Sequence, residues 1–180
     1  VDTSSVKMGV DGDGYIHSVY MDGGDLVYIK TDPLGDTEVF RKLIHTGVWE
    51  YDVVVDDSDI HIAYTVGEYT ASTVNSRLYY VRLDVDGEVT IDDELVTEGE
   101  FTIEGVKVNV NPTDGVALTW MDDRLIMDPD TDCTVFDEDE CFEHHPVCKV
   151  SFTQTPVCVN THKKEGFYNI VDEEGSVVYA

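Results

Sequence analysis

Residues 10–20 read VDGDGYIHSVY, and the chain repeats this stretch. It recurs at residues 55–64 as VDDSDIHIAY, one residue shorter, and more loosely at residues 110–120 as VNPTDGVALTW. A fourth copy begins at residues 171–179 as VDEEGSVVY. Each copy joins an acidic turn to a run in which apolar and polar residues alternate, and a period of two is typical of a half-buried β-strand.

The repeated unit extends beyond this motif. Residues 26–32, LVYIKTD, match residues 78–84, LYYVRLD, and each is followed by a Gly turn and another strand pattern. His17 and His61 occupy equivalent positions 44 residues apart. Four strands at a period of about 40–50 residues are typical of β-propeller blades. We therefore expect an all-β fold of β-propeller-like repeats, each a four-stranded antiparallel blade, with about three blades plus the start of a fourth.

The repeat also sets the expected domain organisation. We expect one propeller-like domain or fragment over residues 1–180, with units at approximately 6–50, 51–105, 106–170 and, in part, 171–180. The third unit is longer because an acidic, cysteine-containing insertion occupies residues 122–146. A closed propeller has about four to eight blades, so we expect this chain to be part of a longer protein or to be completed by partner chains.

The composition is strongly acidic. The chain has 11 Lys and Arg against 38 Asp and Glu, a formal net charge of −27. Such a charge argues against nucleic acid and anionic membrane surfaces as partners, and it favours cation binding or a salty environment, with plain solubility as the alternative. No apolar run approaches the roughly 20 residues that span a membrane. Residues 1–5 have no initiator Met and no signal-peptide pattern, as expected of a mature or excised end.

All the cysteines lie in one part of the chain: Cys133, Cys141, Cys148 and Cys158. An even, clustered set predicts two disulfides and therefore an oxidising compartment, outside the cell or on its surface. Proximity favours the pairs Cys133–Cys141 and Cys148–Cys158 among three connectivities. Zinc is the alternative, although the spacing matches no standard zinc module.

One pattern combines the two repeated motifs: Val-Asp-x-x-Gly-x-Ile-His-x-x-Tyr, followed by Leu-x-Tyr-x-Lys/Arg-x-Asp-x-x-Gly. It resembles the sialidase-like (neuraminidase-repeat) β-propellers, and in particular archaeal and bacterial surface proteins of that superfamily. The resemblance covers most of the chain and implies a propeller fold. The chain lacks two of the family's features. It has no Ser-x-Asp-x-Gly-x-x-Trp box, and no arginine triad stands out among Arg41, Arg77, Arg82 and Arg124. These departures put the family's glycosidase activity in doubt here.

The strongest candidate for a ligand site is the acidic run at residues 128–140. The carboxylates of Asp128, Asp130 and Asp132 stand at positions 1, 3 and 5 of a loop, the backbone carbonyl of Thr134 at position 7 and Asp139 at position 12. Alternating oxygen ligands of this kind suit Ca²⁺. A cysteine replaces the EF-hand glycine, so the run resembles the calcium loops of thrombospondin-type or dockerin-like repeats. The alternative is a solvated acidic loop tied by a disulfide.

Other acidic and histidine residues have simpler explanations. The turns at residues 11–13 and 56–59 are rich in Asp and Gly, which suit turns for backbone reasons, and we favour that interpretation over metal binding. His17 and His61 are equivalent, so we expect both to bond a neighbouring turn rather than to act in catalysis.

Three aromatic residues end the second strand of their units: Tyr20, Tyr64 and Trp120. We expect them to pack between blades, with a sugar-binding platform as the alternative. From these observations we expect a non-enzymatic extracellular or cell-surface binding or scaffold protein, calcium-stabilised and part of a larger assembly with other chains, copies of itself or glycans. The alternatives are a fragment of a sialidase-like glycoside hydrolase or lyase, and a carbohydrate-binding module.

Overall fold

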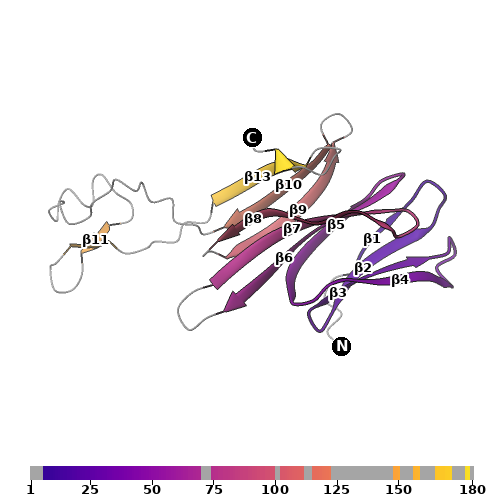
Figure 1. Cartoon of the computed structure of the whole chain (residues 1–180), viewed down its shortest axis with the longest axis horizontal. Coiled ribbons are helices and arrows are strands. Elements are labelled where there is room, and N and C mark those ends of the chain that lie inside the picture. Colours follow the sequence, from indigo (N-terminus) through magenta and orange to yellow (C-terminus); the bar gives the residue numbers. More distant parts are fainter. Residues whose placement is uncertain are drawn as a thin grey trace. The chain divides into compact units, whose positions relative to one another are not determined.

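The computed structural model describes residues 6–69, 74–99, 102–111, 115–122, 148–150, 156–158, 165–171 and 177–178. Every regular element in these ranges is a β-strand, which confirms the all-β prediction. The chain forms two compact units (Figure 1). One holds Val1–Asp122 together with Glu165–Ala180, and the other holds Asp123–Lys164.

Sheet I is the first of three four-stranded antiparallel sheets, and its strands are neighbours in chain order. It consists of β1 (Lys7–Val10), β2 (Ile16–Asp22), β3 (Asp25–Thr31) and β4 (Glu38–His45). Gly23 and Gly24 form the tight turn between β2 and β3, and both have the positive φ that such hairpin turns require. A hydrogen bond of 2.9 Å from the Gly35 amide to the Asp32 carbonyl closes the turn between β3 and β4.

Sheet II repeats this order. It consists of β5 (Val48–Val55), β6 (Asp59–Tyr69), β7 (Val74–Asp84) and β8 (Val89–Gly99). Its turn between β7 and β8 is closed as in sheet I, by a hydrogen bond of 2.9 Å from the Gly87 amide to the Asp84 carbonyl. Residues 32–35 and 84–87 are therefore equivalent turns.

Sheet III is interrupted by the second unit. It consists of β9 (Ile103–Asn111), β10 (Gly115–Asp122), β13 (Glu165–Val171) and β14 (Val177–Val178), in the order β14-β13-β10-β9. The chain leaves this sheet after Asp122 and returns at Glu165, and these two residues are register partners. The second unit contains the hairpin of β11 (Cys148–Val150) and β12 (Pro156–Cys158). It extends past the expected insertion at residues 122–146.

The expected start of a fourth repeat is wrong in the residues that the structure describes. β14 pairs with β13, with Ile170 opposite Val178 and Val171 opposite Val177, and so completes sheet III. The motif at residues 171–179 joins the third and fourth strands of a sheet, whereas the motif at residues 10–20 joins the first and second.

Each sheet has two faces, which we name by the repeat. The front face carries His17 in sheet I, His61 in sheet II and Ala117 in sheet III, and the back face carries the residues that alternate with them. One core cluster joins front residues of sheet I, such as Val19 and Tyr28, to back residues of sheet II. A second cluster joins front residues of sheet II to back residues of sheet III. Sheet II is therefore covered on both faces.

The first strands of the three sheets are neighbours, because β5 contacts both β1 and β9. Polar contacts tie them together. The carboxylate of Asp52 on β5 accepts a hydrogen bond from Lys7 on β1 and another, at 3.1 Å, from the backbone amide of Val108 on β9. Glu50 accepts a hydrogen bond of 2.8 Å from the Gly105 amide. Sheets that follow one another in the chain therefore also follow one another in space.

Candidate functional site

The predicted calcium ligands lie outside the described residues: Asp128, Asp130, Asp132, Thr134 and Asp139. Cys133 and Cys141 also lie outside them. Cys148 and Cys158 are Cα register partners across the hairpin of β11 and β12. Directly opposite residues of antiparallel strands have a Cα separation within the range that disulfides use, so this register supports the predicted Cys148–Cys158 pair.

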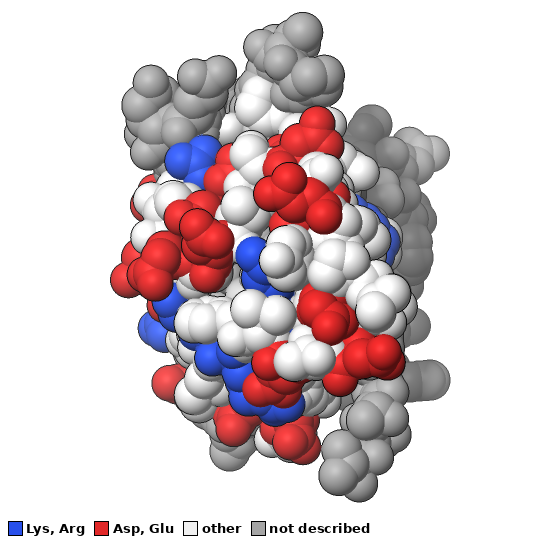
Figure 2. All heavy atoms as spheres, turned by 90° about the vertical axis from the view of Figure 1, so that its right-hand side faces the viewer, with Lys and Arg blue, Asp and Glu red and all other residues white. Residues whose placement is uncertain are grey.

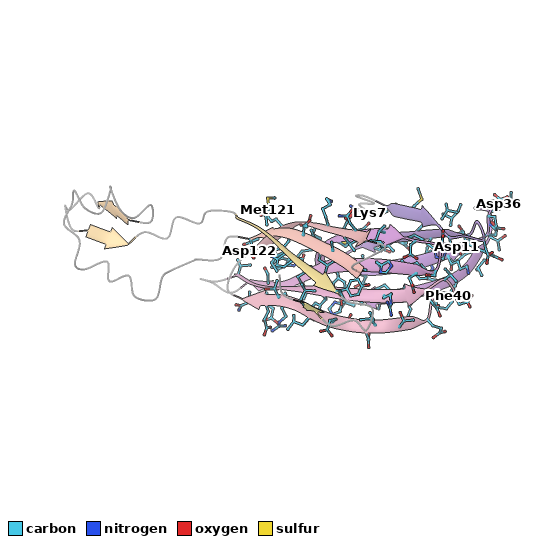
Figure 3. All side chains as sticks on the ribbon, turned by 90° about the horizontal axis from the view of Figure 1, so that it is seen from above. Lys7, Asp11, Asp36, Phe40, Met121 and Asp122 are labelled. Carbon is cyan, nitrogen blue, oxygen red and sulfur yellow. The ribbon has the colours of Figure 1, made fainter. Side chains whose placement is uncertain are left out.

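A buried Asp–His–Tyr contact holds the first turn of sheet I. The Nε2 atom of His17 lies 2.9 Å from Oδ2 of Asp11, and its Nδ1 atom lies 2.8 Å from the hydroxyl of Tyr28. The other oxygen of Asp11 accepts hydrogen bonds from the backbone amides of Asp13 and Tyr15, at 3.0 and 2.9 Å. Figure 3 shows Asp11 at the same end of the strands as Asp36, with Met121 and Asp122 at the opposite end. The carboxylate thus bonds its own turn and the next strand at once.

Burial and hydrogen bonding pull the pKa of Asp11 in opposite directions. Burial raises it, but the bond from His17 and those from the Tyr15 and Asp13 amides outweigh burial, so the pKa of Asp11 lies below its ordinary value. Burial is also the main reason that the pKa of Tyr28 is raised, and the Asp11 charge adds to the effect. The arrangement therefore favours an ionised aspartate and a neutral tyrosine.

Sheet II carries the same contact in a more open form. His61 bonds Asp56 at 3.1 Å and the Tyr80 hydroxyl at 2.7 Å. The Asp56 carboxylate also accepts hydrogen bonds from the amides of Ser58 and Asp59. Its side chain is 33% exposed, against 2% for the aspartate of sheet I. The prediction that both histidines bond a turn is confirmed.

Sheet III lacks the histidine. Ala117 stands at the position of His17 and His61, and Asn111 stands where the other sheets have aspartate. The two positions therefore change together: sheets I and II have Asp with His, whereas sheet III has Asn with Ala. Sequence reasoning missed the tyrosine partners, although Tyr28 and Tyr80 are equivalent in the repeated motifs and could have been found there.

One group in the described residues could hold a metal ion. Single ligand atoms of Asp56, Asp59 and His61 lie within 4.8 Å of one another. These atoms already take part in the turn: Asp56 accepts bonds from two amides and from His61, and Asp59 accepts one from the Ser58 hydroxyl. In sheet I, Tyr15 occupies the position of Asp59. We therefore retain the interpretation of this group as a turn.

A hollow with a volume of about 230 Å³ lies beside the β4–β5 turn. It is lined by His45, Thr46, Gly47, Val66, Gly67, Glu68, Asn75 and Arg77. The His45 ring packs near Tyr64 and Tyr79, with centroid distances of 5.1 and 6.1 Å. Tyr64 donates a hydrogen bond to Asp93, and burial first and that bond second raise its pKa. The hollow is small and its edge is polar.

The back face of sheet I is not covered by any sheet that the structure describes. Three apolar side chains on it are exposed by half or more: Met8 by 69%, Val10 by 58% and Leu43 by 53%. Ile16, Tyr20, Val27 and Ile29 lie beside them in register and are half-buried.

The equivalent positions in the other sheets are covered. Those of sheet II include Ile60, Tyr64 and Val81, which are 0–2% exposed under sheet I. Those of sheet III include Val108 and Leu118, which are at most 3% exposed under sheet II. The back face of sheet I is thus built like two faces that each carry another sheet.

The aromatic residues Tyr20, Tyr64 and Trp120, which were expected to end their strands, lie within β2, β6 and β10 and show this contrast directly. Tyr64 and Trp120 are buried between sheets, which confirms the packing prediction for these two. Tyr20 stands at the same position in sheet I but is only half-buried, because no described sheet covers it. Its hydroxyl accepts a hydrogen bond of 2.8 Å from Arg41, which is also paired with Glu38.

The arginines that the structure describes each bond a different acceptor. Arg41 bonds Glu38, Arg77 bonds Glu98 and Arg82 bonds Thr90, so each has its own acceptor. Arg124 lies outside the described residues.

Within the described part of the chain, no helix is long and apolar enough to cross a membrane. The chain matches no protein-family model, no curated protein and no solved structure.

Proposed function

We propose that this chain is a non-enzymatic extracellular or cell-surface scaffold protein of the β-propeller type, and that it docks a further four-stranded sheet on the back face of sheet I. The observation that carries this proposal is the apolar back face of sheet I, whose equivalents in sheets II and III are each covered by a sheet. Contiguous exposed apolar surface on a folded protein usually marks an interaction site.

The arrangement of the sheets supports the propeller type. Three four-stranded sheets follow one another face to face, with their first strands adjacent. Propeller blades pack in this way around an axis. The net charge of −27 and the clustered cysteines support the extracellular location. In this proposal, the acidic run at residues 128–140 is a calcium loop that stabilises the second unit.

Two alternatives receive less support. A glycosidase of the sialidase type needs a cluster of arginines, and the described arginines are each paired with a separate acceptor. Carbohydrate binding would use the hollow beside His45, whose lining includes Asn75, Glu68 and Arg77. That hollow is smaller than the roughly 300–1,000 Å³ of most small-molecule sites.

The proposal is tested with the dye bis-ANS, which binds exposed apolar protein surface. The native chain at micromolar concentration should bind the dye, and Met8→Lys with Leu43→Lys should abolish binding while the circular dichroism spectrum stays unchanged. Leu95→Lys, an exposed leucine of β8 on sheet II, is the matched control and should leave binding intact. The proposal fails if the native chain binds no dye, or if the control loses as much binding as the double variant.

A further inference from the structure

We propose that the partner of the sheet I back face is a second copy of this chain, which contributes the front face of its sheet III. This inference rests on the proposed docking role of that back face. Its basis is the pair of residues that meets where the front of sheet I lies over the turn at residues 84–87 of sheet II, together with the residues at the equivalent positions of the other sheets.

Between sheets I and II this pair is a cation and an acid. The Lys30 ammonium group donates a hydrogen bond of 2.7 Å to the Val85 carbonyl and lies 3.8 Å from a carboxylate oxygen of Asp86. Lys30 is opposite His17 in sheet I, so it belongs to the front face. Asp86 lies in the turn at residues 84–87 of sheet II.

The sequence has a cation and an acid at the equivalent positions of sheets II and III as well. Arg82 is opposite His61, as Lys30 is opposite His17. Val171 is opposite Val177 as Leu83 is opposite Val89, which aligns Glu174 with Asp86. The sequence therefore places a cation on the front of one sheet and an acid at the aligned position of the next sheet, twice in succession.

The sequence departs from this pattern at both ends of the series. Ile170 is opposite Ala117 and therefore occupies the position of Lys30 and Arg82 on the front face of sheet III. In sheet I the turn at residues 32–35 has Leu34 at the position of Asp86, and that side chain is 82% exposed. At both ends an aliphatic residue stands in place of a charged one, so the two positions match each other in character.

The rest of the two faces is compatible with this match. The front face of sheet III carries Ala117 and Thr119, half-buried, and Met121, which is 44% exposed. Ala117 stands at the position of the buried histidines of the other sheets, so this face has no Asp–His–Tyr contact. Docking of one copy's front face on another copy's back face is a head-to-tail contact, which closes into a ring or continues as a filament.

Charge sets the conditions under which the contact forms. Two copies with a net charge of −27 each repel one another at low ionic strength. The surface in Figure 2 carries many acidic side chains interspersed with a few basic ones and with uncharged areas. At about 1 M salt the screening length falls to about 3 Å, which leaves the apolar contact to act. Self-association should therefore increase with salt.

The experiment is sedimentation equilibrium of the full chain in about 1 M NaCl, where long-range repulsion is screened. The unmodified chain should associate. Leu34→Asp alone and Ile170→Lys alone should each weaken association about tenfold or more, because each buries an unpaired charge against an aliphatic side chain. The chain with both substitutions restores the cation–acid pair and should associate within about threefold of the original. Leu95→Asp, on sheet II, is the control and should change nothing.

Each outcome decides between the proposals. A loss in both single variants with recovery in the double variant supports the head-to-tail contact. If association weakens in the Leu34→Asp variant but not in the Ile170→Lys variant, the sheet III partner is overturned but the docking face stays in place. The same holds if both single variants lose association and the double variant does not recover it. A chain that stays monomeric in high salt overturns self-association. If that chain still binds bis-ANS at the back face of sheet I, the proposed function survives with a different partner.

Discussion

Replacing Asp11 with alanine should destabilise the chain far more than the same change at Asp56. Both aspartates accept a bond from a histidine and bonds from two turn amides. Their exposures differ, with side chains 2% and 33% accessible. Water can therefore replace the lost carboxylate at Asp56, whereas Asp11→Ala leaves a buried imidazole nitrogen and a turn without their partner.

The magnitude follows from this difference in burial. Removing one partner of a buried charged contact costs about 3–5 kcal/mol. At a site that water reaches, a lost hydrogen bond costs about 0.5–1.5 kcal/mol. We therefore expect Asp11→Ala to lower the free energy of unfolding by about 4 kcal/mol and Asp56→Ala by about 1 kcal/mol. Asp11→Asn keeps the acceptor for the turn amides and should lie between them.

The assay is urea unfolding followed by circular dichroism, with the slope of the transition checked for each variant. Thermal unfolding gives a second measure, in which each kcal/mol moves the midpoint by about 2–4 °C for a chain of this size. Asp13→Ala removes an exposed acid from the same turn and serves as the control for net charge. Equal losses for Asp11→Ala and Asp56→Ala would refute the reasoning, because burial would then have no part in the cost.

Three further predictions concern acid, packing and thiols. The pKa values of Asp11 and Asp56 lie below their ordinary value in the folded chain, so the stability that these aspartates contribute is present above about pH 4 and is lost as the pH falls further. The urea midpoint of the unmodified chain should therefore decrease below about pH 4, and that of Asp11→Asn should decrease less. Gly9→Ala would place a Cβ atom 2.5 Å from Cβ of Val55 and should lower the free energy of unfolding by about 1–3 kcal/mol. Gly12→Ala meets only ordinary contacts and should lower it little. Equal urea midpoints for the two variants would contradict the packing between β1 and β5. Thiol titration of the denatured, unreduced chain should find no free cysteine, and two reactive thiols or stoichiometric zinc would exclude the predicted disulfides.

The repeat in the sequence predicted much of the fold for a physical reason. Alternating apolar residues next to Asp and Gly turns favour antiparallel hairpins, and the described strands follow that pattern. His17 and His61 were expected to bond a turn, and they do. The error at residues 171–179 has the same origin, because an acidic turn flanked by apolar residues describes a hairpin without saying which two strands of a sheet it joins.

Other features depend on contacts between distant residues and leave no local signal. The pairing of β10 with β13 joins residues on either side of the second unit, and only the fold brings them together. The contrast between Tyr20 and Tyr64 likewise depends on which face is covered, since both residues are tyrosines at equivalent positions of β2 and β6.

The interruption of sheet III has a consequence for how the chain folds during synthesis. Sheets I and II use contiguous sequence, so both can form once the ribosome has released residues up to Gly99. β9 and β10 must then wait through Asp123–Lys164 before β13 arrives to pair with them. Loop-closure entropy grows only slowly with length, so the delay costs little in final stability, but the late, non-local pairing should be the slow step of folding. Until it occurs, the edge of β10 is open to strands of other nascent chains.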